Sequence, residues 1–252
     1  GKQMLRLPLH PRLARLVVEG EKLGLSESST LLAALLSERD IRLEVRTRLH
    51  EPQAKTHTHG SGPSDLLELL ERFREAENAR FEPERVAALG LDAGAVQAVR
   101  RSQRQMHTII SAHKSLDTRQ TPANGPDEAL LIPILSAFPD RVAKRRKPGS
   151  RELLLAAGGS AILSPSSVVH DPMFVVAVDA EEPKEKLGTR SSVPKIRLAS
   201  AIEVEWLAAL FPESICQETH LMWNERASKV EQVKQTSYDH VTLEETIGRA
   251  PP

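Results

Sequence analysis

The first half of the chain places its apolar residues at the spacing of amphipathic helices. Leucines at this spacing predict a helical hairpin over residues 11–36, with Gly24 in the turn between its two helices. Three more helices are predicted by the same periodicity, each opened by a capping residue or a proline: 64–73, 83–90 and 92–110. The pattern therefore indicates a helical domain.

The second half has a different pattern, in which short apolar runs are separated by Gly, Pro and Ser. These runs predict strands at 152–157, 161–163, 174–178 and 196–198. A short amphipathic helix over 203–211 and a β-hairpin over 215–238 follow. Five or six short strands with one interposed helix fit a small barrel of the OB type. We therefore expect an α+β protein of two domains, a helical bundle followed by an OB-like barrel.

The two patterns meet at residues 138–150, where positive charge is concentrated. Four adjacent cations lie in this joint: Lys144, Arg145, Arg146 and Lys147. Such a cluster is well placed to contact phosphates from both domains. It is equally typical of a solvated helix end, because Lys and Arg favour the last turn of a helix.

Composition changes this picture in one respect. The 252 residues have a net charge of zero, yet residues 1–150 hold 24 Lys and Arg against 19 Asp and Glu, whereas residues 151–252 hold 10 against 15. A polyanion should therefore prefer the first half and the joint.

The single cysteine and the lack of a signal peptide or a membrane-length apolar run fit a reducing, cytoplasmic setting. The lack of an initiating Met suggests a fragment.

Two further pairs of residues are candidates for nucleic-acid contacts. Arg12 and Arg15 are predicted phosphate ligands, although they could equally form the solvated side of their helix. Ser166 and Ser167 are weaker candidates as hydrogen-bond donors, since a capped turn after Pro165 also explains them.

Enzymatic chemistry finds little support in the chain. No G-x-x-x-x-G-K-[ST] loop is present to hold a nucleotide, so we expect no catalytic residue and no ATP hydrolysis. A metal-dependent hydrolase would have to use His50, His57 and His59, which lack a carboxylate cluster. No metal site is therefore predicted.

Several stretches resemble a known family in the order in which they occur. Residues 7–15 (LPLHPRLAR) and 35–40 (LLSERD) resemble the helicase-associated region of DEAH-box helicases, and LSERD points to the bacterial HrpB type. Residues 161–168 are similar to an A-x-I-H-P-S-S-x segment of the family's OB-fold, with Ser164 where His is usual. The stretches 172–176 and 202–207 also occupy family-like positions.

The resemblance implies four regions: a winged-helix remnant at 1–8, a helical ratchet domain at 9–137, the basic joint at 138–150 and an OB-like domain at 151–252. In the family these regions follow two RecA-like motor domains, which bind ATP and Mg²⁺. The chain itself is then expected to hold no cofactor. Its expected partners are single-stranded RNA or DNA and the motor domains of the parent chain, with no membrane involved. The alternative is a free-standing OB-fold adaptor that binds protein partners.

Overall fold

The fold was analysed in a computed structural model, which describes residues 7, 9–43, 60–111, 127–181, 193–225 and 228–249. Most of the expected winged-helix remnant lies outside these ranges, as do His50, His57 and His59. No described helix is both long enough and apolar enough to cross a membrane.

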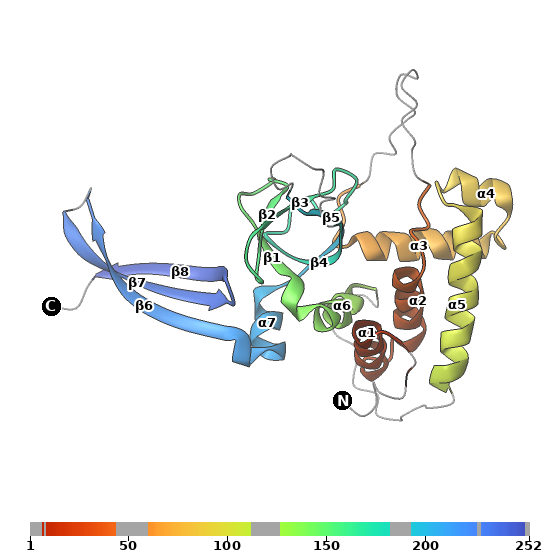
Figure 1. The fold of residues 1–252 in the computed structure, drawn as a ribbon, viewed down its shortest axis with the longest axis horizontal. Helices are drawn as coiled ribbons and strands as arrows, with labels where there is room; N and C mark the ends of the chain where they lie inside the picture. Colours follow the sequence, from red (N-terminus) through yellow and green to blue (C-terminus); the bar gives the residue numbers. More distant parts are fainter. Residues whose placement is uncertain are drawn as a thin grey trace, which may run out of the picture.

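Five helices lie in the described residues up to Ser111 and form the first half of the molecule (Figure 1). They are α1 (Pro11–Lys22), α2 (Ser26–Ser37), α3 (Asp65–Asn78), α4 (Pro83–Ala88) and α5 (Ala93–Ser111). The predicted helices are confirmed, and local chemistry explains where they start. The Ser64 side chain accepts hydrogen bonds from the amides of Leu66 and Leu67, and Asp92 accepts one of 2.7 Å from the amide of Ala95.

The α1–α2 hairpin depends on a glycine in its turn and on a second glycine where its two helices touch. Gly24 has a φ of +77° in the turn, a conformation that glycine adopts without strain. A Cβ on Gly20 of α1 would lie 2.3 Å from the Oγ of Ser29 on α2. A side chain at position 20 would therefore force the two helices apart.

The joint differs from the sequence prediction. Helix α6 (Leu131–Ala137) ends before Pro139, and the 3-10 turn η3 (Pro139–Arg141) leads directly into strand β1 (Val142–Arg145). The cluster of cations is therefore not a helix end. It runs through a strand and the loop after it, and the barrel begins at Val142 rather than at residue 151.

The five short strands of the second half close into a barrel. After β1 come β2 (Glu152–Leu155), β3 (Ser160–Leu163), β4 (Phe174–Glu181) and β5 (Lys195–Ala201). Around the barrel their order is β1-β2-β3-β5-β4, and only the β3–β5 pair is parallel. The interior is filled by small and branched side chains, among them Ala143, Leu153, Val175 and Ala199.

A second sheet stands apart from the barrel, to the left in Figure 1. Helix α7 (Val204–Leu210) leads into β6 (Ile215–Asn224), β7 (Lys229–Tyr238) and β8 (Val241–Arg249), which pair antiparallel in that order. We call β6–β8 the arm. The predicted hairpin is confirmed as β6–β7, but it forms no part of the barrel. The predicted interposed helix likewise follows the last barrel strand, and β8 was not predicted.

The helical half and the barrel share one apolar core. The largest cluster of buried residues joins the helices to the outer side chains of the barrel, including Val176, Val178 and Leu198. The base of the arm joins this cluster through Tyr238, whose hydroxyl donates to the carbonyl of Pro139 at 3.0 Å. Burial raises the pKa of Tyr238 to about 12. The described body of the molecule is therefore packed as one unit.

Candidate nucleic-acid interface

Arg145 lies inside the molecule, with only 1% of its surface exposed. Its guanidinium donates to the carbonyl of Pro172 at 3.0 Å, to that of Val169 at 2.8 Å and to that of Ser150. Desolvation lowers the pKa of Arg145, although an arginine keeps its charge in a protein. Three carbonyls satisfy this buried charge, so the guanidinium of Arg145 is turned away from solvent in this conformation and its predicted phosphate contact stays a prediction.

Lys144 points to the opposite side of the strand, because side chains alternate along β1. Its Nζ donates to the carbonyl of Thr242 at 2.7 Å and lies 5.4 Å from the centre of the Phe174 ring. Lys144 is thus half-buried and connects the barrel to β8 of the arm.

The remaining cations of the cluster lie in the β1–β2 loop and are exposed. Arg146 pairs with Glu152 at 3.1 Å, with both side chains about half exposed, and donates to the Ser160 hydroxyl at 3.3 Å. Lys147 and Arg151 are also exposed. We call Arg146, Lys147 and Arg151 the cationic loop. Arg151 was not among the residues predicted from sequence.

The cationic loop adjoins an outward row of the barrel. Glu152 of β2, Ile162 of β3 and Lys195 of β5 follow one another across three neighbouring strands. All three are exposed, and Ile162 keeps 40% of its surface in contact with solvent. This face therefore combines cations with one acidic and one apolar side chain.

Ser167 does not face solvent. Its hydroxyl donates to the buried Asp65 carboxylate at 2.8 Å, and the same carboxylate accepts the amides of Val168 at 2.7 Å and Ala199 at 2.8 Å. Burial raises the pKa of Asp65, and the three hydrogen bonds offset part of that rise. Ser167 and Asp65 therefore fasten α3 to the barrel, and the nucleic-acid contact predicted for Ser167 stays a prediction.

The two neighbouring serines add to the same junction. Ser164, which replaces the histidine usual in the resembled family, is buried and lies 2.8 Å, hydroxyl to hydroxyl, from Ser166. Ser64 contacts Ser200 of β5 in the same way at 2.7 Å. Ser166 is half-buried, so its predicted role stays a prediction.

Arg12 packs against residues of the joint, and Arg15 packs against a residue just before the arm. Arg12 makes a bidentate ion pair with Asp140 at 2.6 and 2.8 Å and lies 5.4 Å from the centre of the Phe138 ring. The hydrogen bonds with Arg12 lower the pKa of Asp140. Arg15 lies over the ring of Phe211 at 5.5 Å. Arg12 therefore holds α1 against the joint through an ion pair, and Arg15 packs on a ring near the base of the arm. Their predicted phosphate contacts stay a prediction.

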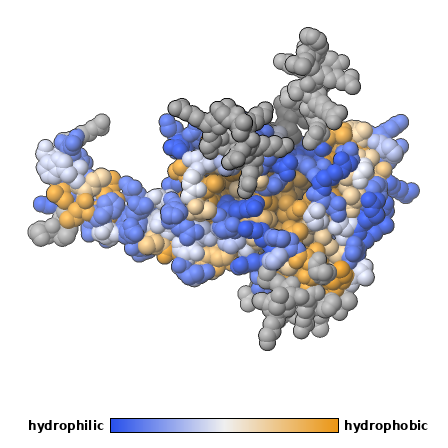
Figure 2. Space-filling model, viewed as in Figure 1, coloured by the Kyte–Doolittle hydropathy of each residue, from blue (hydrophilic) through white to orange (hydrophobic). Residues whose placement is uncertain are grey.

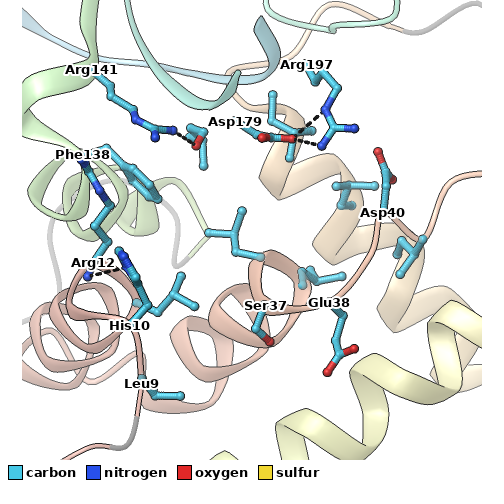
Figure 3. Close-up of a pocket in the computed structure, with 17 residues that line it drawn as sticks. Leu9, His10, Arg12, Ser37, Glu38, Asp40, Phe138, Arg141, Asp179 and Arg197 are labelled. Carbon is cyan, nitrogen blue, oxygen red and sulfur yellow. Dashed lines mark hydrogen bonds and ion pairs between the residues drawn. The ribbon is translucent and has the colours of Figure 1, made fainter. Parts of the chain in front are cut away.

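A cleft of about 750 Å³ opens between the helical half and the barrel (Figure 3). The end of α2 and the start of α1 form one wall, and η3 with strands β4 and β5 forms the other. Its labelled polar side chains are those of His10, Arg12, Ser37, Glu38, Asp40, Arg141, Asp179 and Arg197.

The charges in the cleft are largely paired. Arg197 donates to one carboxylate oxygen of Asp179 at 2.5 and 2.8 Å, and Arg141 donates to the carbonyl of Val178 at 2.9 Å. Burial opposes the ionisation of Asp40, but hydrogen bonds from Arg42 outweigh it and lower the pKa of Asp40. Because the arginines here are already bonded and acidic side chains line the same cleft, the cleft is a poorer phosphate site than the cationic loop.

No group of three or more His, Cys, Asp or Glu side chains in the described ranges is arranged to hold a metal ion. The histidines proposed for the metal-dependent rival lie outside those ranges.

Comparison with known proteins shows that this arrangement of helices, barrel and arm occurs within a helicase structure. No protein-family model matches the chain. Two crystal structures of Escherichia coli HrpB, described as a DExH-box NTPase and as a DEAH/RHA helicase, match it over its whole length. Their TM-scores are 0.57 and 0.54, with 18% and 16% sequence identity, and the match covers 24% of each HrpB chain.

A sequence comparison points in the same direction. The Caenorhabditis elegans protein named as ATP-dependent RNA helicase rha-2 is 25% identical over 249 residues, which is 86% of this chain and 21% of that protein. The chain thus spans about a quarter or less of the length of these relatives. Together the comparisons confirm the resemblance to a C-terminal, helicase-associated region of the HrpB type, and the structural match shows that the fold is shared.

Proposed function

We propose that this chain is the accessory portion of an HrpB-like, ATP-dependent RNA or DNA helicase and that it grips single-stranded nucleic acid. The supporting observation is the match of the whole chain to one part of HrpB, about a quarter of that protein. In this proposal the RecA-like motor domains, with their ATP and Mg²⁺, belong to the rest of a longer polypeptide. The chain alone is then expected to be catalytically silent.

The barrel is proposed to be of the OB type. OB-folds bind oligonucleotides on the face of strands 2 and 3 and with the loops between strands 1 and 2 and between strands 4 and 5. In this chain the β1–β2 loop is the cationic loop, and Ile162 and Lys195 continue from it across the barrel. The exposed cations therefore coincide with the surface that this fold uses for nucleic acid.

Binding there would rely on phosphate contacts. Arg146, Lys147 and Arg151 are long, exposed cations in one loop, and only Arg146 has a carboxylate partner among the described ion pairs. Eight aromatic residues in the whole chain are poor material for stacking bases. We therefore expect weak sequence preference, because phosphates carry no base identity.

The test is a triple substitution of the cationic loop, Arg146→Gln, Lys147→Gln and Arg151→Gln. Each phosphate contact to a single strand contributes about 0.7 to the slope of log affinity against log salt, so losing three lowers the slope by about 2. Fluorescence anisotropy of a labelled oligouridylate, titrated at several salt concentrations, measures both affinity and slope. Circular dichroism checks that the variant is folded.

A matched control removes the same charge from the helical half through Arg85→Gln, Arg101→Gln and Arg104→Gln, three exposed residues on α4 and α5. This control should keep nearly the wild-type slope. Equal losses in both triple variants would mean that only net charge matters. No loss in the loop variant would remove the cationic loop from the interface.

The adaptor alternative is favoured by a separate observation. The described part of the arm has six acidic and three basic residues, together with exposed Leu221 and Trp223. The same titration separates the two functions, because an adaptor has no affinity for the oligouridylate at physiological salt.

A further inference from the structure

Strand β6 is a long edge strand with none of the usual protection. Among the described strands it pairs only with β7, and all its residues from Cys216 to Trp223 are exposed. Natural edge strands are commonly protected by lysines, prolines or bulges. Strand β6 has no Lys or Pro, and its ten-residue register with β7 contains no bulge. Its outer backbone groups are therefore open to another strand.

The distal end of the arm also exposes large apolar side chains. Leu221 and Trp223 project to the same face of β6, and Val230 lies directly opposite Trp223 on β7. Their exposed fractions are 62%, 58% and 43%. Figure 2 shows hydrophobic surface collected near the far end of the arm. Such a cluster beside an open edge marks an interaction surface.

Nucleic acid is a poor occupant of this surface, because the described arm is acidic overall. A protein strand is better suited, since it can satisfy the free backbone groups of β6 and cover its apolar side chains. The sequence of β6 itself, ICQETHLMWN, indicates which strand that is.

We propose that β6 pairs antiparallel with β6 of a second copy of this chain, about a two-fold axis at Thr219. This register places Glu218 of each copy opposite His220 of the other, an acidic residue against a basic one. It also pairs Cys216 with Met222 and Ile215 with Trp223, whereas Leu221 lies opposite Gln217. The two arms then form one continuous six-stranded sheet.

Neighbouring registers lack this complementarity. Moving the axis to His220 places Glu218 opposite Met222 and Gln217 opposite Trp223. Antiparallel pairing also keeps the two bodies apart, because each body joins β6 near Ile215 and the other end of β6 is the free hairpin (Figure 1). The interface is isologous, as closed two-fold dimers require.

The first test is sedimentation velocity of the full chain over a wide concentration range. Wild type should show a reversible monomer–dimer equilibrium. Thr219→Lys places two lysines opposite each other at the axis and should raise the dimer dissociation constant about tenfold. Thr246→Lys is the matched control, because Thr219 and Thr246 are both exposed and both lie opposite Lys234, one on each edge of the arm. The control should dimerise like wild type.

A charge exchange tests the register. His220→Glu should weaken the homodimer by placing two carboxylates opposite each other, and Glu218→Lys should weaken it by removing the carboxylate opposite His220. Mixing the two variants should restore association, because it places the introduced lysine opposite the introduced glutamate. A wild-type chain that stays monomeric at all concentrations overturns the proposal and leaves β6 to a different protein strand. A dimer that Thr246→Lys weakens as much as Thr219→Lys also overturns it. So does a dimer whose charge variants fail to complement each other.

Discussion

The junction between the helical half and the barrel buries its polar residues, whereas strand β6 of the arm exposes them. The second half of the chain supplies strands to both regions. At the junction Asp65, Ser167 and Ser200 are buried, and each has hydrogen-bond partners from across the boundary. In the arm, β6 is exposed along nearly its whole length and is held by cross-strand pairing with β7.

This contrast explains how polar residues are used in the two regions. A buried polar group costs free energy unless it is paired, so the junction tolerates few substitutions. Polar groups on the arm can exchange their partners for water. We therefore expect the junction to carry the stability of the molecule and the arm to carry contacts with other molecules.

The largest expected effect comes from cutting the chain at the boundary predicted from sequence. The fragment 151–252 lacks β1, so β2 and β4 each lose one of their two neighbouring strands and the barrel interior opens. We expect no protected core in this fragment by hydrogen exchange, whereas the full chain should unfold in one transition. The fragment 138–252 restores β1, so protection that returns there would assign the loss to the strand rather than to the helical half. A protected core in 151–252 would show that the barrel does not need β1.

The next largest effect is expected for Asp65→Ala. It removes the acceptor for the Ser167 hydroxyl and two buried amides, which should lower the free energy of unfolding by about 3–5 kcal/mol. Urea denaturation measures this. Glu71→Ala, an exposed position on the same helix, and Leu221→Gln in the arm should each change it by less than about 0.5 kcal/mol. A cost for Leu221→Gln equal to that of Asp65→Ala would erase the contrast between junction and arm.

The smallest effect concerns the partly exposed ion pair of Arg12 with Asp140. Because the folded-state pKa of Asp140 is lowered, the pair stabilises the fold above the ordinary carboxyl pKa, and this contribution is lost as the pH falls through the folded-state value. Asp140→Asn should cost a few tenths of a kcal/mol at neutral pH and nothing in acid, given the exposure of the pair. Thermal melts of both proteins across the acidic range measure the difference. A cost that persists unchanged in acid would assign it to something other than the ion pair.

Local signals determined most of the secondary structure. Helix starts were predictable at Ser64, Pro83 and Asp92, because caps and prolines act within a few residues of their position. The short apolar runs predicted strands β2 to β7, because such a run is also a local feature of the sequence. The order of the family-like stretches also pointed to the fold that the comparison with HrpB shows.

Tertiary structure alone decided what the charged residues do. Adjacent side chains in a strand point to opposite sides, so Arg145 became an internal hydrogen-bond donor while Lys144 reached the arm. Arg146 follows the end of β1 and stayed in solvent. Asp65 looked like an ordinary helix-start residue, and its partners at Ser167 and Ala199 are about a hundred or more positions away in the chain. The separation of the arm from the barrel has the same origin. An alternating pattern predicts a strand, but which strand lies beside it is set by packing between distant segments.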